Sequence, residues 1–230
     1  SIIDAATSCG AEMRVFPHRD YTKLESLLHR YASAPRRVIV TDTVFSMDGD
    51  LADLPMLAAL KRKYDALLIV DEAHATAVLG PAGRGLAELQ GVEDQIDLAV
   101  GTLSKALGGL GGFLAGPGLA IDAAVNLSRP LIFTTALPAA SCAASLKALE
   151  VSQAEPWRRE KALRLAARLR SRLTNAGWNC GDSQTQIVPV IVGAAVHAVA
   201  LSRRLLERGF FAPAIRPPAV PPGGSRLRIS

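Results

Sequence analysis

The 230-residue sequence is poor in aromatic residues and in cysteine, and each scarcity narrows the possible function. Aromatic residues make up 5% of the chain, which leaves few rings for stacking nucleic-acid bases. The three cysteines, Cys9, Cys142 and Cys180, show no paired spacing, so we expect neither a metal site nor a disulfide framework. No apolar run approaches the roughly 20 residues of a membrane-spanning helix. These absences favour a protein of the reducing cytoplasm without a membrane or nucleic-acid partner.

The positive net charge is also no evidence for nucleic-acid binding. The formal charge is +5, and the basic residues concentrate in 158–172 and 203–208. Their spacing there is typical of the polar faces of amphipathic helices. We interpret most of this charge as solvated helix surface, with attraction of a phosphorylated carrier as the open alternative.

Hydrophobic residues make up 49% of the sequence and charged residues 20%, which is ample for a globular core. Two apolar runs, 66–70 and 96–100, read as buried parallel strands. Asp71 follows the first run directly, and Lys105 comes shortly after the second. Because parallel strands bring their C-terminal ends to one sheet edge, we expect Asp71 and Lys105 to meet there.

Lys105 lies among small and glycine residues, where we expect partial desolvation to lower its pKa and free its amine for attack on a carbonyl. The alternative is a solvated lysine in a glycine-rich turn. A lysine that forms an imine and a carboxylate that keeps a pyridine nitrogen protonated are the minimal apparatus of pyridoxal phosphate (PLP) chemistry. His74 is expected to contact the cofactor ring or its phenolic oxygen, against the competing interpretation of a structural histidine.

The tetrapeptide Asp-Glu-Ala-His at 71–74 also occurs in nucleic-acid helicases, as a magnesium-binding box. That function requires a phosphate-binding loop of the Gly-x4-Gly-Lys-Ser/Thr type, which the sequence lacks. We therefore discard the helicase interpretation and predict no metal site.

Four motifs together resemble the α-oxoamine synthase family of PLP-dependent enzymes. They lie at 44–50, 71–74, 101–108 and 133–138, in the family's order, and the resemblance covers nearly the whole chain. It implies an α/β fold of the PLP-dependent transferase fold type I, which is aspartate aminotransferase-like. A large domain with a mostly parallel sheet would occupy residues 1–150, and a small α+β domain residues 151–230. It also implies that the chain lacks an N-terminal portion and a C-terminal segment.

The resemblance assigns roles to individual residues. Lys105 would bind the cofactor covalently and act as general base, with Asp71 and His74 at the ring and Thr102 at the phosphate. The remaining positions are a cofactor-contacting hydroxyl, two threonines that reach a neighbouring subunit, and a substrate-binding C-terminal segment: Ser46, Thr134, Thr135, Arg216, Ala219 and Arg228. The threonines imply a homodimer with shared active sites, although either could instead cap a helix.

Two of the C-terminal positions concern substrate recognition directly. Arg228 would grip the carboxylate of an amino acid, because its guanidinium can bind a carboxylate with two parallel hydrogen bonds. Arg216 opens an Arg-Pro-Pro segment that relatives continue with a substrate-contacting threonine. Here Ala219 stands in its place, which leaves that contact open.

The implied reaction is a decarboxylating condensation of L-alanine with a pimeloyl thioester, carried by acyl carrier protein or coenzyme A, in biotin biosynthesis. One alternative is a glycine-using sister enzyme, a 2-amino-3-ketobutyrate ligase or a 5-aminolevulinate synthase. Ser104 and the segment 134–138 favour the alanine-using member. The other alternative is an inactive fragment that keeps the fold.

The pattern of apolar residues also predicts local structure. We expect strands at 9–16 and 37–41 and an edge strand at 187–192, where a proline interrupts the ladder. Helical periodicity predicts helices at 21–34, 55–64, 121–128, 139–153, 160–173 and 196–207.

Overall fold

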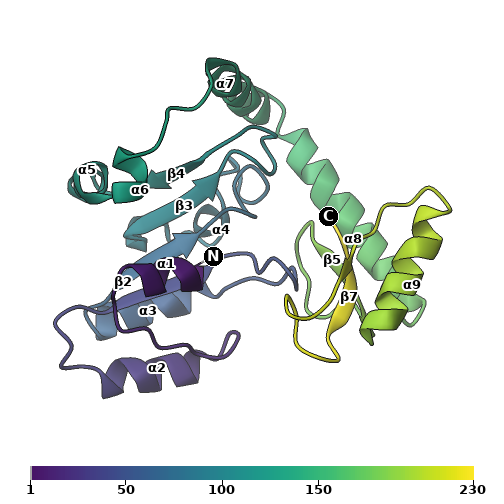
Figure 1. Cartoon of the computed structure of the whole chain (residues 1–230), viewed down its shortest axis with the longest axis horizontal. Coiled ribbons are helices and arrows are strands. Elements are labelled where there is room, and N and C mark those ends of the chain that lie inside the picture. Colours follow the sequence, from purple (N-terminus) through teal and green to yellow (C-terminus); the bar gives the residue numbers. More distant parts are fainter. Residues whose placement is uncertain (1) are drawn as a thin grey trace. The chain divides into compact units, whose positions relative to one another are not determined.

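The computed structural model describes residues 2–230 and divides into two compact units (Figure 1). The first unit runs up to Thr43 and resumes from Ala52 to Glu155. The second comprises Val44–Leu51 and Pro156–Ser230. The short segment 44–51, called the 44–51 loop below, therefore packs with residues that lie more than a hundred positions further along the chain.

The sheet of the first unit is mixed but mostly parallel, as the sequence predicted. Its strand order is β1 (Val38–Asp42), β2 (Leu67–Asp71), β3 (Leu98–Thr102) and β4 (Gly112–Ala115). β1, β2 and β3 are parallel, while β4 runs antiparallel to β3. The register sets Asp42 opposite Asp71 at the C-terminal ends of β1 and β2.

Helices cover the β1–β2 half of this sheet, where Leu68 and Val70 are fully buried. The helices of the unit are α1 (Ile2–Ser8), α2 (Tyr21–Arg30), α3 (Leu54–Lys63), α4 (Leu86–Leu89), α5 (Gly118–Leu127), α6 (Arg129–Ile132) and α7 (Ala139–Ala154), with a 3₁₀ turn at Glu93–Gln95. α3 packs on β2, and α2 on α3 (Figure 1). α3 begins at Asp53, whose side chain accepts a hydrogen bond from Met56 N at 3.0 Å, a typical N-cap.

The β4 side of the sheet is far more exposed. All four residues of β4 are exposed, including Phe113 and Leu114, and Ser145 is the one buried residue of α7. Further large apolar side chains are exposed on the helices of this region, and at the C-cap of α6: Leu119, Leu127, Leu131, Leu146 and Phe133. This continuous part of the chain thus presents an extensive apolar surface.

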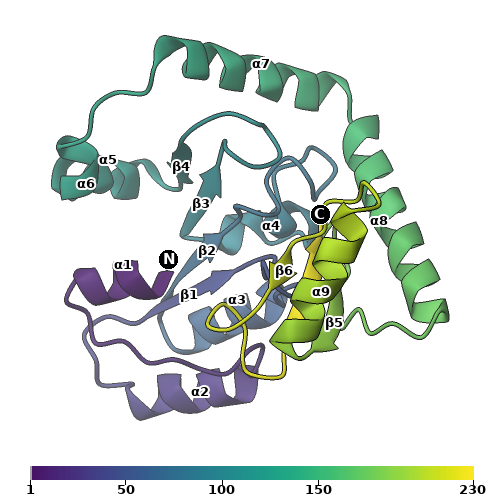
Figure 2. The same ribbon diagram turned by 45° about the vertical axis from the view of Figure 1, so that its right-hand side comes forward.

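The second unit is a three-stranded antiparallel sheet with two helices. The sheet order is β5 (Val188–Gly193), β7 (Ser225–Ile229) and β6 (Ala214–Ile215), so the prediction of an edge strand at 187–192 is confirmed. The helices are α8 (Trp157–Asn175) and α9 (Ala195–Leu206), and Figure 2 shows α9 alongside the sheet. Within residues 2–230, no helix combines the length and the apolar composition needed to cross a membrane.

The two faces of this small sheet differ in chemistry. Val190 of β5 and Leu227 of β7 form a buried cluster against Leu201 of α9. Because side chains alternate along a strand, Arg226 and Arg228 of β7 lie on the opposite face. That face carries two guanidinium groups side by side.

The prediction of a strand at residues 9–16 is wrong. Residues 2–8 form α1, and residues 11–16 have no regular secondary structure. Met13 and Val15, two large apolar residues of this segment, are exposed by 37% and 67%. No strand in the described part of the chain pairs with this segment, and a strand without a ladder partner is not stable.

Candidate active site

Three ionisable groups converge at the C-terminal edge of the first sheet. Asp42 and Asp71 are register partners at the ends of neighbouring parallel strands. Lys105 follows the end of β3, and its positive charge lowers the pKa of Asp42, so the ammonium lies within electrostatic reach of Asp42. Asp71 Oδ1 accepts a hydrogen bond from Ala73 N at 2.8 Å, which orients this carboxylate. The structure therefore brings Asp71 and Lys105 to one edge.

Asp42 carries an unusual proton affinity. Burial, reinforced by the negative charge of Asp71, raises its pKa from 3.8 to about 6, with Lys105 acting in the opposite direction. Desolvation and a like charge both disfavour the ionised carboxyl. Asp42 thus exchanges its proton close to neutral pH.

This shift predicts a pH-dependent loss of stability that Asp42→Asn removes. The folded state holds the Asp42 proton more tightly than the unfolded state, so the free energy of unfolding falls as pH rises from about 4 to above 6. The full shift corresponds to about 3 kcal/mol, which solvent screening of this partly exposed group reduces to about 1–2 kcal/mol. Urea unfolding at pH 4.5 and 7.5 measures it as the difference between wild type and variant at each pH.

The control for this prediction is the same substitution at the exposed Asp94. Asp42→Asn should gain stability over wild type at pH 7.5 and little at pH 4.5, and Asp94→Asn should not. Equal effects of Asp42→Asn at both pH values would contradict the raised pKa of Asp42.

The segment after β3 presents hydroxyl groups beside Lys105. Thr102 Oγ1 donates to the Gly111 carbonyl oxygen at 3.1 Å and lies 2.7 Å from Ser104 Oγ. Gly108 N donates to Lys105 O at 3.0 Å in a turn where Gly108 has φ +63°, a conformation that glycine adopts readily. The prediction that Lys105 is partly desolvated is wrong for this chain, because the residue lies in an exposed turn beyond the strand end.

Glu72 is a buried residue that the sequence analysis did not single out. It is 3% exposed and accepts hydrogen bonds from Thr43 Oγ1 at 2.7 Å, Leu86 N at 3.0 Å and Ala87 N at 2.9 Å. Burial raises its pKa, and the three donors oppose that rise. A Cβ on Gly85 would lie 2.6 Å from this carboxylate, so the glycine permits the approach.

Through its bonds to Leu86 N and Ala87 N, Glu72 joins the two ends of the segment 72–87, which carries His74. His74 lies half-buried in the turn that follows β2. The sequence contains two signals for this role of Glu72. It is an acid directly after Asp71, and glycines flank Arg84, where the backbone can approach a carboxylate closely.

Thr134 and Thr135 lie in the exposed segment between α6 and α7. Thr134 Oγ1 donates to the Thr135 carbonyl oxygen at 3.4 Å. The alternative role as a helix cap is wrong, because Pro138 occupies the N-cap position of α7 and no side chain caps that helix.

The remaining predicted residues lie in the second unit. Arg228 Nε donates to the Ser46 carbonyl oxygen at 2.6 Å. Within residues 2–230, this is the one hydrogen bond that Arg228 makes through its side chain, so its two terminal nitrogens remain available to a ligand. Burial lowers the pKa of Arg228. Arg216 and Ala219 are exposed, and Ala219 N donates to Arg216 O at 3.0 Å.

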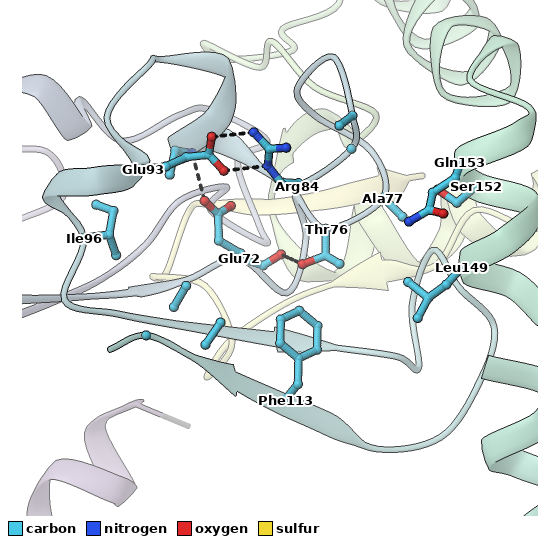
Figure 3. Close-up of a pocket in the computed structure, with 16 residues that line it drawn as sticks. Glu72, Thr76, Ala77, Arg84, Glu93, Ile96, Phe113, Leu149, Ser152 and Gln153 are labelled. Atoms are coloured by element: carbon cyan, nitrogen blue, oxygen red, sulfur yellow. Dashed lines mark hydrogen bonds and ion pairs between the residues drawn. The ribbon is translucent and has the colours of Figure 1, made fainter. Parts of the chain in front are cut away.

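A separate pocket of about 400 Å³ lies over β3 and β4 of the first unit (Figure 3). Its lining combines small alanine and glycine residues with the apolar Phe113 and Leu149 and with polar side chains that include Glu72 and Arg84. Arg84 at this pocket is already paired with Glu93 through two hydrogen bonds of 2.7 Å. None of the predicted site residues lines the pocket, so we place the candidate site at the strand edge instead.

Comparison with known proteins identifies the family and the fold. The family model for class I and II aminotransferases matches residues 1–230. An 8-amino-7-oxononanoate synthase of Geobacter sulfurreducens is 48% identical over 232 residues, covering 100% of this chain and 59% of that protein. The chain thus spans about three fifths of the length of the curated relatives it matches.

Two solved structures are similar as well. An SPT structure with PLP as an internal aldimine has a TM-score of 0.88 and 34% identity, over 93% of this chain and 54% of that one. The 8-amino-7-oxononanoate synthase from Francisella tularensis has a TM-score of 0.86 and 25% identity, over 100% of this chain and 65% of that one. The predicted fold type, and with it the resemblance on which it rested, is confirmed.

Proposed function

The chain belongs to the class I and II aminotransferase family, and on that premise we propose that it carries out the chemistry of a PLP-dependent 8-amino-7-oxononanoate synthase. The reaction would join L-alanine to a pimeloyl thioester with loss of carbon dioxide, in the biotin pathway. The observation that carries this proposal is the convergence of Asp71 and Lys105 at the C-terminal edge of a parallel sheet.

The residues at this edge fit PLP chemically. Lys105 offers an amine for covalent attachment, Asp71 a carboxylate for the pyridine nitrogen, and Thr102 a hydroxyl for the phosphate. His74 and Ser46 would complete the contacts with the cofactor. Bound PLP supplies an electron sink that stabilises negative charge at the α-carbon of an amino acid.

The chain's own groups would move and hold the protons. The Lys105 amine would take the α-proton of the substrate as general base. The Asp71 carboxylate, oriented by Ala73 N, would hold the proton at the pyridine nitrogen. Arg228 would bind the substrate carboxylate through its terminal nitrogens, while Ser46 O holds its Nε.

Assembly and carrier form the second part of the proposal. The exposed apolar surface of β4 and α5–α7 favours a homodimer, and the exposed Thr134 and Thr135 would reach the neighbouring active site. The acyl donor would be a pimeloyl thioester of acyl carrier protein or coenzyme A, and the protein would act in the cytoplasm.

Substrate preference distinguishes this proposal from the alternative of a glycine-using sister enzyme. Initial rates with L-alanine and with glycine test it, on protein from the complete reading frame. We expect a preference for L-alanine, and Arg228→Lys should raise the KM for L-alanine by about 10–100-fold with a smaller change in kcat, because lysine cannot form two parallel bonds to a carboxylate. A preference for glycine would assign the sister reaction, and an unchanged KM would remove Arg228 from the binding site.

A further inference from the structure

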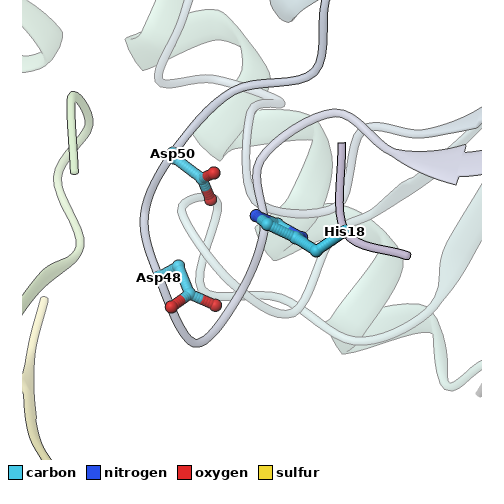
Figure 4. A group of neighbouring side chains, drawn as sticks. All are labelled: His18, Asp48 and Asp50. Carbon is cyan, nitrogen blue, oxygen red and sulfur yellow. The ribbon is translucent and has the colours of Figure 1, made fainter. Parts of the chain in front are cut away.

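The two arginines of β7 hold one short loop from the N-terminal half of the chain. Arg226 Nη1 donates to Met47 O at 3.1 Å and to Asp48 Oδ1 at 2.5 Å, and its Nε donates to Gly224 O at 2.9 Å. Arg228 Nε donates to Ser46 O. Three successive residues of the 44–51 loop are thus bound from one face of one strand; Figure 4 shows Asp48 and Asp50 on this loop.

A second set of contacts fixes the same loop at Gly49. Its carbonyl oxygen accepts from Gln184 N and from Thr185 Oγ1, both at 2.9 Å. Gly49 has φ +70°, and a Cβ there would lie 2.3 Å from Ile187 O, so only glycine fits. Within the second unit, the loop is therefore held between Arg226 and residues 184–187.

Burial distinguishes the two arginines. The Arg226 side chain is 8% exposed, and it is salt-bridged to Asp48. Arg228 is less buried and leaves its terminal nitrogens open among the described residues. All the side-chain hydrogen bonds of Arg226 thus go to the protein itself, while Arg228 is bonded only through Nε.

We propose that Arg226 is a positioning residue for amino-acid recognition. By holding Met47 O and Asp48, it keeps the Ser46 carbonyl where it orients Arg228 Nε, so that the terminal nitrogens of Arg228 face a substrate carboxylate. This inference rests on the proposed function, and it adds Arg226 and Asp48 to that site although neither touches the substrate.

Arg226→Lys tests the inference, because Arg226 reaches Gly224 O through Nε and Met47 O and Asp48 through Nη1, whereas lysine carries all its donors on one nitrogen. The matched control is Leu227→Ala, the adjacent residue of the same strand, which points to the opposite, apolar face. It destabilises the unit without removing a bond to the loop. Both variants are compared with wild type in protein from the complete reading frame, with Asp48→Asn as the partner variant.

The readouts are the KM and kcat for L-alanine, the melting temperature, and amide hydrogen exchange of residues 44–51. Arg226→Lys should raise the KM about tenfold with kcat within about twofold, and should speed exchange in the loop. Asp48→Asn should change the KM and the loop exchange in the same direction, by a smaller amount. Leu227→Ala should lower the melting temperature at least as much as Arg226→Lys does. It should leave the KM for L-alanine and the exchange of the loop unchanged.

Equal KM values for Arg226→Lys and Leu227→Ala at similar melting temperatures would overturn the inference. So would loop exchange that Arg226→Lys leaves unchanged. Failure of wild type to turn over L-alanine would instead overturn the proposed function, and with it the substrate half of the inference. Loop exchange is measured without substrate, so it tells the two failures apart.

Discussion

Replacing Lys105 with alanine is expected to abolish the visible absorption band of lysine-bound PLP and to reduce turnover by roughly 10³-fold or more. Two functions disappear together in this variant: the covalent attachment point and the general base. Fold stability should change little, because Lys105 is exposed in a turn beyond β3. Absorbance spectra with added PLP and initial rates with L-alanine measure the two losses.

Lys147→Ala is a matched control for this prediction. Lys147 is an exposed lysine of α7 whose ammonium pairs with Glu150 at 2.9 Å. Its removal should leave both the band and the rate unchanged. A band that persists in Lys105→Ala would assign the attachment to a different lysine and contradict the proposed active site.

The second large effect is expected for Asp71→Asn, which should lower kcat by about 10²–10⁴-fold while PLP still binds. The amide oxygen can keep the hydrogen bond from Ala73 N, so the local geometry is retained. What is lost is the negative charge that keeps a pyridine nitrogen protonated. Stopped-flow or steady-state rates, together with a PLP titration, separate the loss of chemistry from any loss of binding.

Asp42→Asn provides the comparison for Asp71→Asn. It removes the neighbouring carboxylate, which is the register partner of Asp71, without touching the proposed ring contact. Its kcat should stay within about tenfold of wild type. Equal losses in the two variants would mean that the pair acts as an undifferentiated acidic cluster and would contradict the role given to Asp71.

Much of the strand-edge site could be predicted from local sequence. The apolar run before Asp71 is uninterrupted, and the run at 96–100 contains one polar residue, Asp97. Both runs are short, a pattern typical of buried parallel strands. Strand ends then determine position, because all parallel strands finish at the same edge. The helix at 54–63 was predictable for a similar reason, since its apolar positions recur with helical spacing.

The rest depends on contacts that leave no local signal. Arg226 binds Asp48 across 178 positions of sequence, and neither residue is distinctive among charged residues of the chain. The 44–51 loop therefore read as a turn of the first domain, although it packs with the second unit. The predicted strand at 9–16 failed for the converse reason: its apolar residues have the right composition, but the described chain offers no partner strand.

Reduction with sodium borohydride in the presence of PLP, followed by peptide mapping, tests the central claim most directly. Borohydride converts a lysine–PLP imine into a stable secondary amine, so the mass of the cofactor stays on the peptide that held it. We predict a single labelled peptide with the added mass on Lys105, and no label in Lys105→Ala. A label on any other lysine, or none in protein from the complete reading frame, would contradict the assignment of this site to PLP.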